Sequence, residues 1–237
     1  KSDRVGGKLC VQHSAGFSYD LGPSMLTMPY ILRDLLHRAH ARLEDHLDIK
    51  RVTPYWRCFF DDRTVLNLWP ELEKSCVEFS RLGPEGGRQL HAFSDYAGFQ
   101  FDTVRPFYFD RGVDYLHDVL VRSGLKKLVK VDLLRTMAAA IAARVKHDHA
   151  RDVLGYFSKY IGSSPFAAPG FLNLLFAVQQ RYGVWHITGG MYRLAATLEE
   201  LLTRAGVRIH RNSEAWRLLV QDGRTEGIAT IDGEHHY

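Results

Sequence analysis

The sequence predicts a mixed α/β fold in which both chain ends build one part and a mostly helical segment is inserted between them. Glycine turns and short strand-like runs gather in residues 1–25 and 185–237, whereas apolar residues recur at helical spacing in residues 26–184. The 237 residues, 46% of them hydrophobic, suffice for one large domain or two small ones. We therefore expect three segments with these limits, the first and last belonging to the same domain.

At the N-terminus, a glycine turn at residues 4–8 leads into a short strand at residues 9–12. A second strand is expected at residues 17–20, ended by Leu-Gly-Pro-Ser. Apolar residues then recur every three or four positions, which predicts a helix over residues 29–45 with Pro29 in its first turn.

The middle of the chain predicts a hairpin followed by helices. Residues 55–60 and 64–68 are expected to form two strands around a turn. Residues 70–100 are expected to be helical around a glycine and proline break at residues 83–87. A helix with one apolar and one basic face is expected over residues 124–150, and residues 171–178 are predicted to be a buried or interfacial helix.

The last fifty residues predict a helix and three strands. An apolar stripe over residues 191–205 ends at Gly206, as a helix does. Strands are expected at residues 207–210, 216–220 and 227–231, with Asp222-Gly223 as a tight turn between the last two.

Charge and cysteine content exclude several classes of protein. The net charge of +4 is too mild, without a reading motif, to indicate nucleic-acid binding. The three cysteines, Cys10, Cys58 and Cys76, are odd in number and lack a CxxC pair, so we expect neither a disulfide framework nor a zinc site. No apolar stretch is long enough to span a membrane, the first residues lack the apolar run of a secretion signal, and a reducing cytosol fits best.

Most of the positive excess lies in one segment. Residues 122–151 hold eight basic residues against two acids. As an amphipathic helix, the stretch 126–146 is expected to rest on anionic lipid, and the alternative is a solvated helix face. Histidines at 147, 149, 235 and 236 have no further ligands at metal-site spacing, so no metal is expected.

Three segments together resemble a known family. They are Arg-Val-Gly-Gly-Lys at residues 4–8, Gly-Phe-Ser-Tyr-Asp-Leu-Gly-Pro-Ser at 16–24, and Tyr-Gly-Val-Trp-His-Ile-Thr-Gly-Gly-Met at 182–191. In order and spacing they resemble the bacterial phytoene desaturases, within the FAD-dependent amine-oxidase-like flavoproteins. The resemblance covers nearly the whole chain.

The resemblance implies a partial Rossmann-like FAD-binding domain with an inserted, mostly helical domain for substrate and membrane binding. It also implies that the GxGxxG turn and the closing FAD segment of the family lie outside this sequence, so this chain is expected to be a fragment. FAD is the implied cofactor. A cytoplasmic protein attached to the membrane surface is the implied location, and the oligomeric state stays open.

The resemblance also implies which residues contact FAD. Glycines without Cβ let backbone amides approach a phosphate, a lysine adds positive charge, and a rigid turn borders the flavin. The implied cofactor-binding residues are Gly6, Gly7, Lys8, Gly22, Pro23, Ser24, Gly189, Gly190, Glu214 and Ala215. An ordinary tight turn is the alternative for the Gly-Gly-Lys segment.

The implied reaction is desaturation of a phytoene or diapophytoene type of polyene, in which a hydride and a proton leave neighbouring carbons. A carboxylate in an apolar tunnel is the natural proton acceptor, and Asp95 resembles such a residue in the family. The arginine that usually lies nearby is replaced by Gly98, and a solvated helix carboxylate is the alternative.

Other functions stay open at this point. One is a related flavoprotein, such as an amine oxidase or a retinol-saturase-like enzyme, with a different pocket. Another is a membrane-surface binding module without catalysis, which would bind lipid but no flavin. A helical DNA-binding protein is a distant third.

Overall fold

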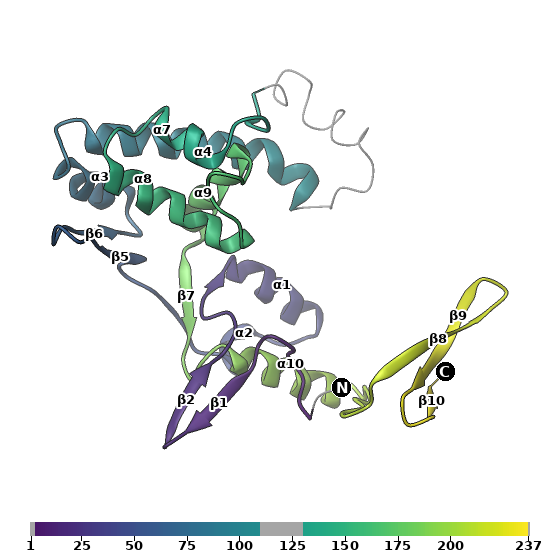
Figure 1. Cartoon of the computed structure of the whole chain (residues 1–237). Helices are drawn as coiled ribbons and strands as arrows, with labels where there is room; N and C mark the ends of the chain where they lie inside the picture. Colours follow the sequence, from purple (N-terminus) through teal and green to yellow (C-terminus); the bar gives the residue numbers. More distant parts are fainter. Residues whose placement is uncertain (1–2, 110–129, 237) are drawn as a thin grey trace. The chain divides into compact units, whose positions relative to one another are not determined.

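A computed structural model describes residues 3–109 and 130–236. Its compact units are residues 1–50 with 185–237, and residues 51–184. The sequence interpretation placed the first division after residue 25 instead. Most of the helices and strands are labelled in Figure 1.

The first unit begins with an antiparallel hairpin. β1 (Val11–Ser14) pairs with β2 (Phe17–Asp20), as expected from the sequence within two residues. Ala15 and Gly16 make the turn with φ of 49° and 81°, the left-handed conformation that two-residue hairpin turns require. The amide of Leu21 donates to the carbonyl of Cys10 over 2.9 Å and extends the pairing.

The helix expected over residues 29–45 is wrong as a single helix. α1 (Pro29–Arg38) ends before His40, whose φ is 55°, and α2 (Leu43–His46) follows. The break turns α2 back toward α1, so apolar residues from both helices enter one core. That core contains Leu32, Leu36, Leu43, Leu47, Ile187 and Met191. Burial of these side chains outweighs the helical continuity that the apolar spacing favours.

A small sheet connects distant parts of the chain. β7 (Val184–Ile187) is the central strand between β3 (Leu26–Thr27) and β4 (Ile49–Arg51). α10 (Tyr192–Arg204) follows β7, and Gly206 with φ of 80° lies just after its end, as the sequence predicts.

The C-terminal strands form a separate three-stranded sheet in the order β10–β9–β8. β8 (Ala215–Gln221) and β9 (Arg224–Thr230) are joined by Asp222 and Gly223, both with positive φ, which confirms the predicted tight turn. β10 (His235–His236) pairs with β9. The strand expected at residues 207–210 is wrong, because these residues pair with no strand in the described part of the chain.

The second unit opens with the predicted hairpin of β5 (Trp56–Phe59) and β6 (Val65–Leu68). α3 (Leu72–Ser80) and α4 (Gly86–Tyr108) then pack against each other around the predicted break. Gly86 and Gly87 allow the close approach, since an added Cβ would lie 2.0 Å and 2.6 Å from carbonyl oxygens of α3.

The helix expected over residues 124–150 is also wrong in its described part. Residues 130–136 are irregular, and short helices follow: α7 (Met137–Ala142), α8 (Asp148–Gly155), η1 (Tyr156–Ile161), η2 (Gly170–Asn173) and α9 (Leu174–Tyr182). The hydroxyl of Thr136 caps α7 by accepting from the amide of Ala139 over 3.2 Å. Because Thr136 caps the start of α7, the residues before it and α7 cannot form one continuous helix. The apolar spacing alone does not reveal that the threonine side chain competes with a continuous helix in this way.

Aromatic side chains build the core of the second unit. Phe93 of α4 meets Phe176 of α9 edge to face at 5.4 Å, and Phe157 of η1 meets the same ring at 5.6 Å. The predicted apolar run near residues 171–178 therefore forms η2 and much of α9, with Phe176 and Val178 buried.

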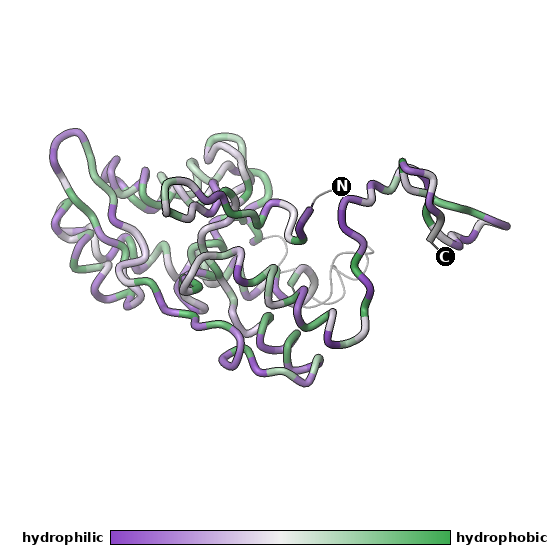
Figure 2. The backbone as a smooth tube through the Cα atoms, turned by 90° about the horizontal axis from the view of Figure 1, so that it is seen from below, coloured by the Kyte–Doolittle hydropathy of each residue, from purple (hydrophilic) through white to green (hydrophobic). Residues whose placement is uncertain are grey.

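Hydrophobic and hydrophilic stretches alternate along the chain (Figure 2). Among the described residues, no helix has the length and apolar character to cross a membrane. Cys10, Cys58 and Cys76 are all free thiols, and burial raises the pKa of Cys58 and Cys76.

Candidate functional site

Asp20 connects the two glycine motifs, although 171 residues separate it from Met191. Its carboxylate accepts a hydrogen bond from the Met191 amide over 2.8 Å and lies 3.5 Å from the Tyr192 amide. These amides open α10, so the negative charge also lies at the positive end of the helix dipole. The contact brings residues 16–24 against residues 189–192, as the order of the motifs suggests.

Gly190 is a glycine because of Asp20. Its φ is 94°, and an added Cβ would lie 2.9 Å from the carboxylate of Asp20. Gly189 also has positive φ, 88°, and its added Cβ would meet only the side chain of Arg193, at 3.5 Å. The structure therefore explains Gly190 by a contact within the chain, whereas Gly189 keeps an open face.

Gly6 and Gly22 pack the turn at residues 6–9 tightly. A Cβ on Gly6 would lie 2.6 Å from the carbonyl oxygen of Leu9 and 2.9 Å from Cβ of Ala195 in α10. A Cβ on Gly22 would lie 1.8 Å from the carbonyl oxygen of Lys8. The turn is thus held between α10 and the segment that follows β2.

Gly7 and Lys8 are the members of this turn that face outward. Gly7 has a φ of 55° and no atom within 4 Å of its missing Cβ, and the Lys8 side chain is exposed. We call Gly6, Gly7, Lys8, Asp20, Gly22, Gly189 and Gly190 the glycine cluster. An open backbone turn with an adjacent lysine fits a phosphate group, while Asp20 already occupies the start of α10.

The remaining predicted cofactor residues lie beside or apart from this cluster. Pro23 and Ser24 are exposed in the segment between β2 and β3. Glu214 and Ala215 lie at the start of β8, where the carbonyl of Glu214 accepts from the amide of Ile231 over 2.9 Å. Their contact with a cofactor stays a prediction.

Asp95, the predicted catalytic carboxylate, lies on α4 with 74% of its side chain exposed. Its carboxylate is 3.4 Å from Nδ1 of His91, one helical turn away. These surroundings match the solvated helix carboxylate better than an apolar tunnel, and the catalytic role stays a prediction.

An arginine does lie near Asp95, although position 98 is glycine. A Cβ on Gly98 would lie 3.2 Å from the guanidinium of Arg181, which comes from α9. Arg181 binds Asp102 through its two terminal nitrogens, Nη1 and Nη2, with Nη2 at 2.8 Å from Oδ2. The hydrogen bonds lower the pKa of that carboxyl. Asp95 and Arg181 line the same open cleft of about 440 Å³.

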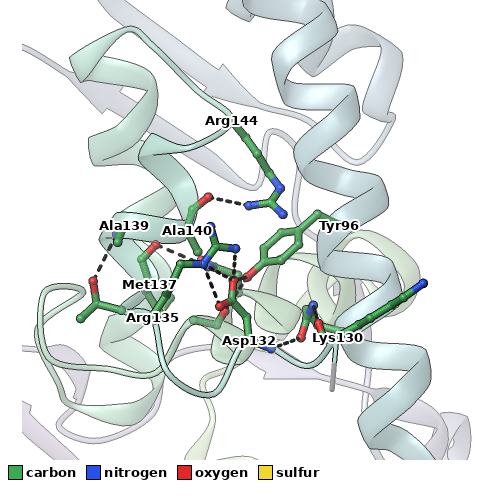
Figure 3. A network of polar contacts seen from close by, with 12 residues as sticks. Tyr96, Lys130, Asp132, Arg135, Met137, Ala139, Ala140 and Arg144 are labelled. Atoms are coloured by element: carbon green, nitrogen blue, oxygen red, sulfur yellow. Dashed lines mark hydrogen bonds and ion pairs between the residues drawn. The ribbon is translucent and has the colours of Figure 1, made fainter. Parts of the chain in front are cut away.

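The next residue, Tyr96, anchors a polar network that sequence analysis missed (Figure 3). Its hydroxyl lies 2.9 Å from Oδ2 of Asp132 and 3.0 Å from the carbonyl oxygen of Gly170. The guanidinium of Arg144 stacks 3.6 Å from the ring centroid, and Arg135 pairs with Asp132. Burial, followed by the hydrogen bond to Asp132 and its charge, raises the pKa of Tyr96 to about 12, so the network holds a neutral phenol.

This network changes the interpretation of the basic stretch 126–146. Arg135 pairs with Asp132, Arg144 stacks on the ring of Tyr96, and Arg151 pairs with Asp148 over 3.0 Å. Residues 122–129 lie outside the described part of the chain. The expected continuous basic helix face is therefore wrong for residues 130–146, because its arginines are used in internal contacts and its helix is interrupted.

His149 forms a contact rather than a metal site. Its Nε2 lies 2.8 Å from Oδ2 of Asp62, and its ring stacks on Phe60 with centroids 3.9 Å apart. The hydrogen bond from His149 lowers the pKa of Asp62 to about 2. No group of three potential metal ligands occurs among the residues that the structure describes.

Comparison with known families agrees with this geometry. The model of the flavin-containing amine oxidoreductases matches residues 1–236. The chain belongs to this family. A flavin-containing amine oxidoreductase uses a flavin cofactor, and the open turn of the glycine cluster is a candidate for contact with its phosphate.

Within the flavin-containing amine oxidoreductases, the chain is similar to curated carotenoid oxygenases. It is 37% identical over 235 residues to a 4,4'-diapolycopene oxygenase of Methylomonas sp, and 35% identical over 236 residues to a 4,4'-diaponeurosporene oxygenase of Staphylococcus haemolyticus. Each match covers 99% of this chain and 47% of the relative. The chain thus spans about half the length of these relatives.

Solved structures share the fold at low identity. A double mutant of putrescine oxidase aligns with a TM-score of 0.59 and 12% identity, over 99% of this chain and 49% of that one. A Rab GDI from Plasmodium falciparum aligns with a TM-score of 0.52 and 14% identity, over 93% of this chain and 48% of that one. These likenesses confirm the amine-oxidase-like α/β fold and say nothing about substrate.

Proposed function

We propose that the protein carrying this chain is an FAD-dependent oxidoreductase that acts on a carotenoid polyene. The observation that carries the proposal is the match, over 99% of the chain, to enzymes named for diapolycopene and diaponeurosporene. The glycine cluster supports the cofactor, because its open turn and Lys8 suit a dinucleotide phosphate.

The chain's own residues would bind and orient. When bound, FAD supplies the two-electron oxidation that no side chain can perform. Gly7 and Lys8 would hold phosphate, and Pro23 and Ser24 would border the isoalloxazine beside Gly189. Asp20 positions this arrangement by joining the segment after β2 to the start of α10.

Two oxidations of a polyene are candidates. The names of the relatives favour oxygenation, and the motifs at residues 4–8, 16–24 and 182–191 favour desaturation through their resemblance to phytoene desaturases. In a desaturation, Asp95 would accept the proton that leaves with the hydride. We propose oxygenation as the principal activity, since the relatives named for it match nearly the whole chain.

The test is a spectrum followed by product analysis. The purified protein should show flavin absorption, and anaerobic addition of 4,4'-diapolycopene should bleach it. In an oxygenation in which the flavin takes a hydride and water adds to the oxidised carbon, labelled water brings labelled oxygen into the product, whereas phytoene desaturation removes two hydrogens and lengthens the absorbing polyene. A flavoprotein that leaves both polyenes unchanged would refute the proposal.

Further incubations separate the other functions. Oxidation of putrescine in place of a polyene would favour an amine oxidase, a reaction for which only the fold argues at present. Binding to lipid vesicles without flavin absorption would favour the membrane-surface module without catalysis.

A further inference from the structure

Lys159 of η1 lies among aromatic rings in the second unit. Its Nζ is 3.5 Å from the ring centroid of Trp56, 4.5 Å from that of Tyr156 and 5.3 Å from that of Tyr160. Trp56 and Tyr156 meet edge to face at 5.3 Å. Tyr156 is 51% exposed and Tyr160 37%, so the rims of this aromatic cage face outward.

Gln179 of α9 holds two of the rings, Trp56 and Tyr160, by hydrogen bonds. Its Oε1 accepts from Nε1 of Trp56 over 3.0 Å and from the hydroxyl of Tyr160 over 3.3 Å. The residue is 1% exposed, and its Nε2 has no hydrogen-bond partner among the described residues. A buried amide with one donor unused leaves hydrogen-bonding capacity beside the cage.

Lys159 also differs from a comparable lysine. Lys74 lies 5.7 Å from the ring of Trp69, but its ammonium is 3.3 Å from the carboxylate of Glu71. In the described part of the chain, no carboxylate forms an ion pair with Lys159. Burial lowers the pKa of Lys159 to about 8, against the attraction of the rings for the ammonium.

A mostly apolar cavity shares Tyr156 with the cage. It has a volume of about 480 Å³, and Ala138, Ala142, Gly155 and Phe166 line it together with the charged Asp148, Arg151 and Asp152. Small residues leave room for an extended chain, and the two aromatic rings suit a conjugated one. An unpaired amine therefore lies across one tyrosine ring from a space that fits part of a polyene.

We propose that Lys159 binds the aldehyde end of an oxidised polyene as an imine, with the apolar chain in the cavity beside Tyr156. The amine nitrogen attacks the carbonyl carbon, the C=N bond forms, and the carbonyl oxygen leaves as water. Protonation makes the imine a cation, which the rings of Trp56 and Tyr156 stabilise. The substrate class rests on the proposed function, since aldehydes are among the oxidation levels that oxygenation can produce.

Reductive trapping tests the proposal in the purified protein. Retinal, a polyene aldehyde, is added with sodium cyanoborohydride, and the modified lysines are located by peptide mass spectrometry. At pH 8 we expect at least about tenfold more adduct on Lys159 than on Lys74, because an amine with a pKa near 8 is about half neutral there, whereas the ammonium of Lys74 is paired with Glu71.

The comparison within one protein needs no variant, so a folding defect cannot obscure it. Equal labelling of Lys159 and Lys74 would overturn the proposal. Lys159→Arg keeps the positive charge against the rings and should abolish the adduct, whereas Lys74→Arg should leave the Lys159 adduct unchanged.

The adduct needs no flavin, so missing flavin bands would refute the proposed function without affecting this test. Equal labelling by retinal and propanal would overturn the polyene preference.

Discussion

Single side chains in both units are committed to contacts within the chain. Asp20 binds the start of α10, and Tyr96 is enclosed between Asp132 and Arg144. Gly22 and Gly190 are glycines because neighbouring protein atoms leave no room for a Cβ. Gly7, Lys8 and Asp95 differ, since they face outward where a ligand or solvent can reach them.

Asp95→Asn should separate chemistry from stability. Because the side chain is 74% exposed, its loss of charge should change the free energy of unfolding by less than about 0.5 kcal/mol. A drop in turnover would then report a chemical role, measured as kcat against KM with a polyene substrate.

Tyr96→Phe is the matched control for Asp95→Asn. It removes a hydroxyl that contacts Asp132 and Gly170, and should cost about 1–2 kcal/mol in urea unfolding. If Asp95→Asn destabilised the protein as much as Tyr96→Phe, the exposed environment assigned to Asp95 would be wrong.

Asp62 should make stability depend on acidity. Its folded-state pKa of about 2 lies below the ordinary 3.8, so the carboxylate stabilises the folded state above about pH 4. This contribution disappears as the pH falls through about 2. The urea midpoint of Asp62→Asn should therefore lie below that of the wild type at about pH 6 and approach it near pH 2.

The neighbouring Asp61→Asn serves as the reference for this experiment. Asp61 is exposed. Its substitution should therefore leave the change in urea midpoint between the two pH values close to that of the wild type. A gap between Asp62→Asn and the wild type that persists unchanged to pH 2 would contradict the role of the His149 contact.

Helix boundaries in this protein follow capping and burial more than apolar spacing. α1 stops where His40 turns the chain, and α7 starts where Thr136 caps it. α10 starts where the carboxylate of Asp20, distant in sequence, accepts its first amide. Each of these helix ends determines where a helix of the site or of the core lies.

Asp20→Ala should weaken the join between the two glycine motifs. Loss of a capping carboxylate costs about 0.5–2 kcal/mol, which urea unfolding of the purified protein measures. We also expect flavin content to fall, because Gly190 and the segment after β2 lose their common contact.

Asp20→Asn keeps an acceptor oxygen and should lose less stability than Asp20→Ala. Unchanged stability and unchanged flavin content in Asp20→Ala would show that the carboxylate does not position the cluster.

The whole chain contains one unit that carries the glycine cluster and another that carries α3, α4, α7, α8 and α9, the aromatic cage and the cavity. We propose that the protein contacts the membrane surface, as the net charge of residues 122–151 leads us to expect. Of the described basic residues there, Lys130 and Lys146 are exposed, whereas Arg135 and Arg151 pair with carboxylates and Arg144 stacks on Tyr96.

Binding to anionic vesicles should therefore depend on these lysines. Replacing both Lys130 and Lys146 by Gln should weaken binding by about fivefold for each lysine, at about 1 kcal/mol each, and added salt should do the same. Arg144→Gln should lower stability while leaving vesicle affinity almost unchanged. Vesicle co-sedimentation with and without salt measures both, and an unchanged affinity of the double variant would exclude this surface.

The sequence by itself determined the family, the β1–β2, β5–β6 and β8–β9 hairpins, the break between α3 and α4, and the ends of α10, because glycine turns and alternating strands are local signals. Tertiary structure alone decided the break after α1, the contact of Asp20 with α10, the Tyr96 network and the cage around Lys159. These features depend on which distant atoms meet. Spacing along one segment does not contain that information, because burial and capping by distant residues override local preference.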